Sequence, residues 1–112
     1  VRCLQSDVFD GVDGDFDLIV VDPPFRWFPA RDLLERAITD EGYATLGRFV
    51  GEVSARLRTG GSVLLFFGTT GDVEHLDGLI ADAGLESDTV AERTFRPRGQ
   101  ETTYFVRRLT LG

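Results

Sequence analysis

The fold of this chain is decided by the stretch Phe16-Asp17-Leu18-Ile19-Val20-Val21-Asp22-Pro23-Pro24-Phe25. Its first six residues are mostly apolar and rich in Val and Ile, which is typical of a strand that a parallel sheet buries on both faces. Pro23 and Pro24 then end the strand, because proline has no N–H to donate and restricts the residue before it. The sequence therefore predicts a buried strand over Phe16–Val21 that runs directly into a stiff turn.

Apolar helices and strands alternate along the rest of the chain. Apolar residues recur every three or four positions over Glu41–Arg58 and over Asp72–Ala83, which predicts two helices; Gly60-Gly61 and Gly84 follow as stop signals. We expect further strands at Arg2–Gln5, Ser62–Gly68, Asp88–Phe95 and Glu101–Leu109, and a short helix at Arg31–Ile38. The last two strands are joined by turn residues and should form an antiparallel hairpin.

This order of elements predicts an α/β fold with a mostly parallel sheet, right-handed crossovers and a C-terminal antiparallel hairpin. In such open sheets, ligands bind outside the carboxyl ends of the strands. Asp7, Asp22 and Gly68-Thr69-Thr70 each follow a predicted strand, so we expect these segments to lie at the same edge of the sheet.

Length and composition limit the classes of protein to consider. The chain of 112 residues, 42% hydrophobic and 28% charged, suits one globular domain. Its apolar runs are far shorter than the about 20 residues of a membrane-spanning helix, so we expect no membrane contact. The single cysteine, Cys3, excludes an internal disulfide and a thiolate-rich metal site, and no other metal-ligand spacing is present, so we expect no metal. A cytoplasmic setting fits these features.

The net charge of −7 argues against a broad nucleic-acid-binding surface, because non-specific affinity for nucleic acid comes from clustered Lys and Arg. All 12 basic residues are arginines, however, and several gather near the C-terminus. This asymmetry could face an anionic partner, but solvated strand faces and a hairpin tip are the favoured explanation.

The loop after the first buried strand has chemistry that suits a planar amino group. The carboxylate and carbonyl oxygens of Asp22 are hydrogen-bond acceptors, and Phe25 offers an aromatic face. Acceptors in a rigid loop would hold the amino hydrogens and orient the nitrogen lone pair. On residue chemistry alone, the alternative that Asp22 merely ends a strand and Pro23-Pro24 merely turns the chain remains open.

Asp22-Pro23-Pro24-Phe25 resembles the Asn/Asp/Ser-Pro-Pro-Tyr/Phe/Trp motif of class I S-adenosylmethionine-dependent amino-methyltransferases. These include adenine-N6, cytosine-N4 and guanine-N2 enzymes and the glutamine-N5 enzymes that modify release factors. The strand Phe16–Ile19 is similar to the one that carries the motif, and Leu57–Leu65 resembles the family's Leu-x-Pro-Gly-Gly passage, with Thr59 where proline is common. Ser6–Phe9 is similar to the family's loop after its third strand.

The resemblance implies a Rossmann-like sheet and roles for the motif residues. Asp22 would accept a hydrogen bond from the target amino group, Pro23 would shape the loop and present its carbonyl, and Phe25 would stack on the target. Pro24 and Trp27 would help to form the substrate pocket. Catalytic roles would thus fall to Asp22, Pro23 and Phe25.

The resemblance also implies a cofactor site for S-adenosylmethionine. Asp7 would accept a hydrogen bond from the adenine amino group of the cofactor, and the Val8 backbone would contact the same ring. The family's glycine-rich loop after its first strand has no counterpart here, because Gly11-x-x-Gly14 precedes a strand and opens no helix. We therefore expect residues 1–112 to be the C-terminal part of one catalytic domain, spanning the third to seventh strands, with the N-terminal strands missing. The remainder of the domain or a partner chain would complete the cofactor site.

Three functional hypotheses follow. The first is methyl transfer to a planar-conjugated amino nitrogen, of an RNA or DNA base first and of a protein glutamine second. The alternative is a catalytically silent methyltransferase-like module that supports a partner subunit. The third is a different nucleotide-binding α/β domain, in which Asp22 would serve a phosphate or a metal.

Overall fold

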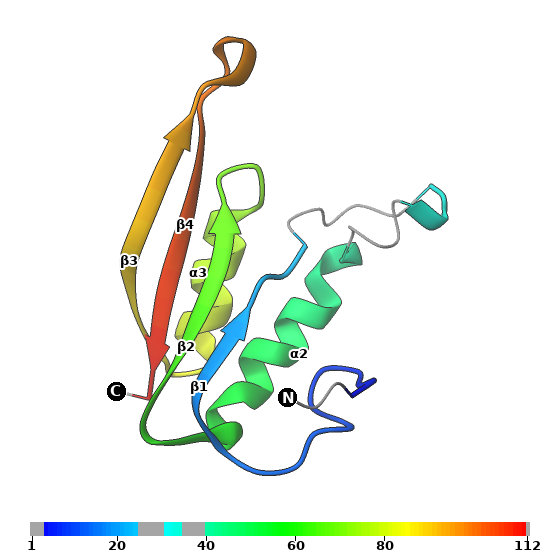
Figure 1. Cartoon of the computed structure of the whole chain (residues 1–112), viewed down its shortest axis with the longest axis vertical. Coiled ribbons are helices and arrows are strands. Elements are labelled where there is room, and N and C mark those ends of the chain that lie inside the picture. The colour runs from blue at the N-terminus through cyan, green and yellow to red at the C-terminus, as the bar shows by residue number, and fades with distance from the viewer. Residues whose placement is uncertain (1–3, 25–30, 35–39, 112) are drawn as a thin grey trace.

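The computed structural model describes residues 4–24, 31–34 and 40–111 of the chain. These residues form one sheet and two long helices, with short 3₁₀ turns between them (Figure 1). The strands are β1 (Phe16–Val21), β2 (Leu57–Gly68), β3 (Glu86–Phe95) and β4 (Thr102–Thr110), and the helices are α2 (Ala44–Val53) and α3 (Val73–Asp82). The 3₁₀ turns cover Glu41–Tyr43, Ser54–Arg56 and Pro97–Gly99.

The strands lie in the order β1-β2-β4-β3. β1 and β2 are parallel and are joined through α2, whereas β4 is antiparallel to both of its neighbours. The prediction of an α/β sheet with a parallel crossover and a C-terminal antiparallel hairpin is therefore confirmed. The carboxyl ends of β1 and β2 lie at the same edge, which also receives the start of α2 (Figure 1).

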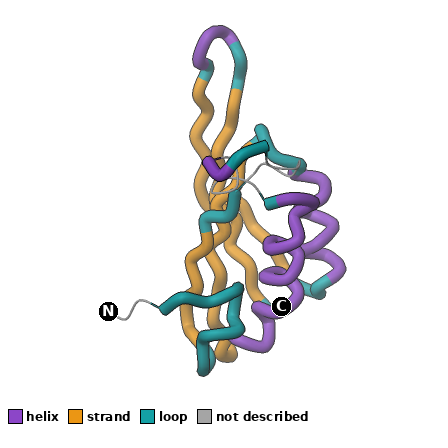
Figure 2. Tube along the Cα trace, turned by 90° about the vertical axis from the view of Figure 1, so that its right-hand side faces the viewer, coloured by secondary structure: helices purple, strands orange, loops and turns teal. Residues whose placement is uncertain are grey.

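Both helices cover the same face of the sheet, and the core lies between these two layers (Figure 2). The most deeply buried side chains come from both layers: Leu46, Val50, Val53, Val63, Leu65, Phe67, Leu76 and Leu109. Each such side chain contributes about 1.5–3 kcal/mol when removed from water. The apolar side chains spaced every three to four residues in α2 and those at alternate positions of β2 therefore pack together in a single core.

The other face of β1 is not covered by any element that the structure describes, contrary to the prediction of a doubly buried strand. Ile19 and Val21 pack against the core, but Leu18 and Val20 on the opposite face are 54% and 59% exposed. Alternate residues of a strand point to opposite faces, so covering one face by helices leaves every second side chain open. The apolar run therefore gives an apolar open face.

The first predicted helix ends earlier than its periodicity indicates. α2 ends at Val53, a 3₁₀ turn follows, and β2 begins at Leu57, which is buried and pairs with Phe16. The register then shifts, because Phe16 pairs with Leu57 but Leu18 pairs with Ser62. Gly60 takes a positive φ of 82° at this irregularity, which an L side chain rarely adopts. Pairing with β1 therefore overrides the helical pattern.

Of the remaining predicted elements, one helix is confirmed and one strand is wrong. The second predicted helix is confirmed as α3, with Asp72 as its cap: the Asp72 carboxylate accepts a hydrogen bond from the His75 N–H at 3.0 Å. Leu4 and Gln5 are not in a strand, so the predicted first strand is wrong over these residues. Half of the predicted helix Arg31–Ile38 lies outside the described residues; of the half that is described, Leu33 and Leu34 are helical.

Neither α2 nor α3 nor any shorter helix of the described ranges has the length and apolar character needed to cross a membrane.

Candidate functional site

Asp22, Pro23 and Pro24 directly follow β1 at the carboxyl edge of the sheet. Asp22 is exposed, and the alternation along β1 places it on the same open face as Leu18 and Val20. The two other predicted substrate residues, Phe25 and Trp27, lie outside the described residues. The structure thus gives the position of the acceptor carboxylate and of the rigid turn after it.

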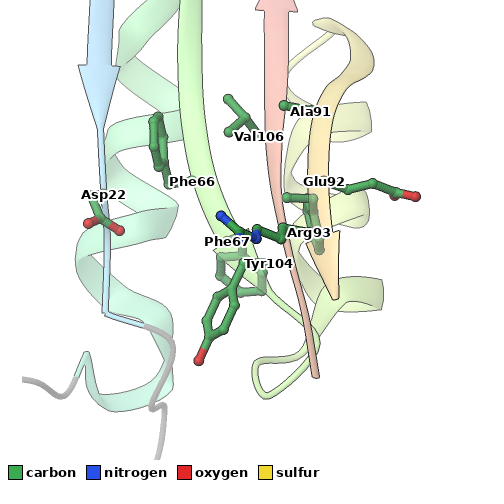
Figure 3. Close-up of a pocket in the computed structure, with 9 residues that line it drawn as sticks. Asp22, Phe66, Phe67, Ala91, Glu92, Arg93, Tyr104 and Val106 are labelled. Atoms are coloured by element: carbon green, nitrogen blue, oxygen red, sulfur yellow. The ribbon is translucent and has the colours of Figure 1, made fainter. Parts of the chain in front are cut away.

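A pocket of about 610 Å³ lies on the open face beside Asp22 (Figure 3). Its lining comes from the end of β1 and from the three other strands, and Phe66 and Tyr104 on it are 39% and 45% exposed. The residues that line it are Asp22, Phe66, Phe67, Ala91, Glu92, Arg93, Tyr104, Phe105 and Val106. Asp22 therefore stands at the rim of a cavity with aromatic walls.

Strand register explains how this pocket forms. Phe66 pairs with Val106, and Val106 pairs with Ala91, so these side chains form one row across the open face. Arg93 pairs with Tyr104 in the next row toward the carboxyl edge. These residues were not predicted as a site, although apolar residues at alternate positions of the predicted strands are a signal for a second apolar face.

The loop between β2 and α3 is held tightly beside this edge. The Thr69 N–H donates to the Thr103 carbonyl at 2.9 Å, and the Thr103 N–H donates to Thr69 Oγ1 at 3.0 Å. Gly71 has no room for a side chain, since a Cβ there would lie 2.7 Å from the Phe67 ring. This predicted ligand-binding loop is therefore anchored to β4.

The beginning of α2 adds a buried polar anchor at the same edge. Asp40 is only 6% exposed, and its two carboxylate oxygens accept hydrogen bonds from the N–H groups of Thr45 and Leu46 at 2.9 and 2.8 Å. Burial raises the pKa of Tyr43, whose hydroxyl accepts a hydrogen bond from the Asp72 N–H. These contacts join the starts of α2 and α3.

Asp7 and Val8, the predicted cofactor residues, lie in a segment that packs against α2. Asp7 Oδ2 forms an ion pair with Arg48 Nη1 at 2.8 Å, and this hydrogen bond raises the pKa of Arg48. Nearby, the Phe9 ring stacks on that of Phe49 with centroids 5.4 Å apart. In Figure 1 this N-terminal segment lies beside the lower half of α2, whereas β1 points toward the upper end of that helix. The structure therefore does not bring Asp7 to Asp22.

Val8 has a positive φ of 57°, which is rare for a β-branched residue, and its carbonyl accepts a hydrogen bond from Ser6 Oγ at 2.9 Å. The roles of Asp7 and Val8 in cofactor binding stay predictions. Within the described residues, no three His, Cys, Asp or Glu side chains gather in a way that would hold a metal ion.

No family model matches the chain, and no curated protein matches it. The chain is similar in structure to a methyltransferase from Pyrococcus furiosus, with a TM-score of 0.51 and 18% sequence identity. The similarity covers 88% of this chain but only 43% of that one. The described sheet and helices therefore have a methyltransferase-like Rossmann fold and span less than half the length of the structure that they match.

Proposed function

We propose that this protein transfers a methyl group from S-adenosylmethionine to a planar-conjugated amino nitrogen. One observation carries the proposal: Asp22 stands exposed at the carboxyl end of β1, between the Pro23-Pro24 turn and an aromatic pocket. Its place in a methyltransferase-like fold and its resemblance to the amino-methyltransferase motif support the same activity.

In this proposal, Asp22 accepts a hydrogen bond from the amino group of the acceptor. Holding one N–H fixes the direction of the nitrogen lone pair, and the negative carboxylate stabilises positive charge that develops on nitrogen during the transfer. Pro23 and Pro24 limit the motion of the loop, since each ring fixes its own φ near −65°. Phe25 and Trp27 would stack on and enclose the acceptor.

The preferred acceptor is an RNA or DNA base, and a protein glutamine comes second. Both present a planar amide-like or aromatic amine, but only a base has a wide ring for the pocket beside Asp22. The S-adenosylmethionine site would need the remainder of the catalytic domain or a partner chain in addition to Asp7 and Val8.

The alternative is a catalytically silent methyltransferase-like module. The observation that favours it is the ion pair between Asp7 and Arg48, which occupies the carboxylate predicted to bind the cofactor. The methyl-incorporation experiment described next distinguishes this module from an active methyltransferase.

The experiment measures incorporation of tritiated methyl groups by the complete protein into single-stranded RNA, single-stranded DNA and a glutamine-containing peptide. We expect Asp22→Ala to abolish incorporation and Asp22→Asn to retain part of it, because asparagine keeps a carbonyl acceptor. The matched control is Asp15→Ala, which removes an exposed aspartate just before β1 and should leave the rate unchanged. Full activity of Asp22→Ala would overturn the proposal, and no incorporation by the wild type into any acceptor would favour the silent module.

A further inference from the structure

The pocket beside Asp22 has opposite charges on its two sides. Asp22 brings a carboxylate from the end of β1, and Arg93 brings a guanidinium from β3, with exposed faces of Phe66 and Tyr104 between them. Figure 3 shows the Arg93 guanidinium directed over Tyr104 toward the side of Asp22, whereas Glu92 points away from the pocket. A ligand that fills this pocket therefore meets an acceptor at one end and a cation at the other.

Arg93 forms no ion pair with a carboxylate of the described residues, whereas two other arginines of the hairpin do. Arg96 pairs with Glu101 at 3.1 Å, and Arg107 pairs with Asp77 at 2.6 Å. The Arg93 guanidinium instead lies over the ring of Phe95, 5.3 Å from its centroid. A cation held over an aromatic face does not use its N–H donors for that contact, and the forked N–H donors of a guanidinium suit a phosphate.

The width of the pocket matches an elongated ligand. β1 and β3 are separated by two intervening strands, so with about 4.8 Å between neighbours they lie about 14 Å apart. Arg93 extends back across part of this distance (Figure 3). The remaining gap suits a planar base over Phe66 and Tyr104 with a phosphate at Arg93, whereas a glutamine side chain has neither a wide ring nor an anion.

We infer that this pocket binds a nucleotide, with its base amino group at Asp22 and its phosphate at Arg93. The inference rests on the proposed function, to which it adds a phosphate anchor and a substrate class. It also reconciles the net charge of −7 with a nucleic-acid substrate, because one local cation can hold one phosphate without a broad basic surface.

The test compares the binding of adenosine, cytidine and guanosine with that of their 5′-monophosphates to the complete protein by isothermal titration calorimetry. We expect at least one monophosphate to bind about tenfold more tightly than its nucleoside, the gain of a charge-assisted hydrogen bond. Arg93→Gln should bring this ratio close to one, and Arg93→Glu should invert it. Inversion is a readout that partial unfolding does not produce.

Arg108→Gln is the matched control. Arg108 lies on the same open face of the neighbouring strand β4 but does not line the pocket, so the variant should keep the preference for the monophosphate. Asp22→Ala should also keep that preference while losing methyl transfer, which separates this inference from the proposed function. Equal binding of nucleosides and monophosphates to the wild type would overturn the inference, as would an unchanged ratio in Arg93→Gln or saturable binding of a glutamine peptide alone.

Discussion

The phenolic oxygen of Tyr43 lies 2.9 Å from the backbone nitrogen of Asp72 and accepts its hydrogen bond. This contact joins the residue before α2 to the cap of α3, and the Tyr43 ring also stacks on His75 with centroids 5.4 Å apart. The starts of both helices are thereby joined at the carboxyl edge of the sheet, where Asp22 follows the end of β1. The contact therefore bears on stability and on the geometry of the candidate site.

Tyr43→Phe should lower the free energy of unfolding by about 1 kcal/mol, because the Asp72 N–H loses its acceptor. The free energy of unfolding of the variant should also depend less on alkaline pH than that of the wild type. Burial raises the pKa of Tyr43, so the wild type keeps this contribution below the ordinary tyrosine pKa of 10.0 and loses it as the pH rises through the higher pKa of the folded state. Urea midpoints on either side of pH 10.0 measure both effects.

In Tyr43→Phe the alkaline loss should shrink, whereas Tyr104→Phe, at an exposed tyrosine of β4, should retain it. Identical alkaline losses in the wild type and Tyr43→Phe would contradict the explanation.

Asp40→Ala should destabilise the protein by about 1–2 kcal/mol, the usual cost of removing a side chain that caps a helix. Both carboxylate oxygens of Asp40 accept N–H groups of the first turn of α2, and the site is closed to water that would replace them. Urea unfolding gives the free-energy difference. Glu41→Ala is the control, since Glu41 is exposed and its loss should change stability by less than about 0.5 kcal/mol.

Gly61→Ala and Gly78→Ala should change stability in opposite directions. A Cβ on Gly61 would lie 2.9 Å from the Arg58 carbonyl oxygen and 3.0 Å from that of Phe16, so the strands must shift at a cost of about 1–3 kcal/mol. A Cβ on Gly78 in α3 meets nothing within 4 Å, so alanine should stabilise that helix by about 0.5–1 kcal/mol. Thermal unfolding should show one midpoint lowered and the other raised; equal shifts would show that the irregularity in β2 tolerates a side chain.

Asp7→Ala should weaken the binding of S-adenosylmethionine to the complete protein, measured by calorimetry. Asp10→Ala is the matched control, because Asp10 also pairs with Arg48, at 3.1 Å, and has no predicted contact with the cofactor. Both variants lose a contact with Arg48, so a difference in cofactor affinity reports the role of Asp7 itself. Equal affinities in the two variants would assign Asp7 to the ion pair alone.

Local pattern predicted the elements of this fold well where the signal lies within a few residues. The run Phe16–Val21 ends at the proline turn as expected, and the hairpin strands end within two residues of their predicted bounds. The error at the end of α2 has a physical cause: Leu57 continues the apolar spacing of the helix, but pairing with Phe16 places it in β2.

One part of the candidate site could be predicted from the sequence and the other part could not. The acceptor Asp22 and its rigid turn were identified from sequence, because their chemistry is contained in adjacent residues. The aromatic pocket with Arg93 was not, because its members come from separate strands and meet only through their register.

The sequence by itself determined the order and type of the main elements and the acceptor loop after β1, since periodicity and proline chemistry act over short distances. Only the tertiary structure decided which face of β1 is covered, where Asp7 lies and what stands opposite Asp22. These depend on contacts between residues far apart in the chain: helices that cover one face leave Leu18 and Val20 open, and Arg48 holds Asp7 on α2.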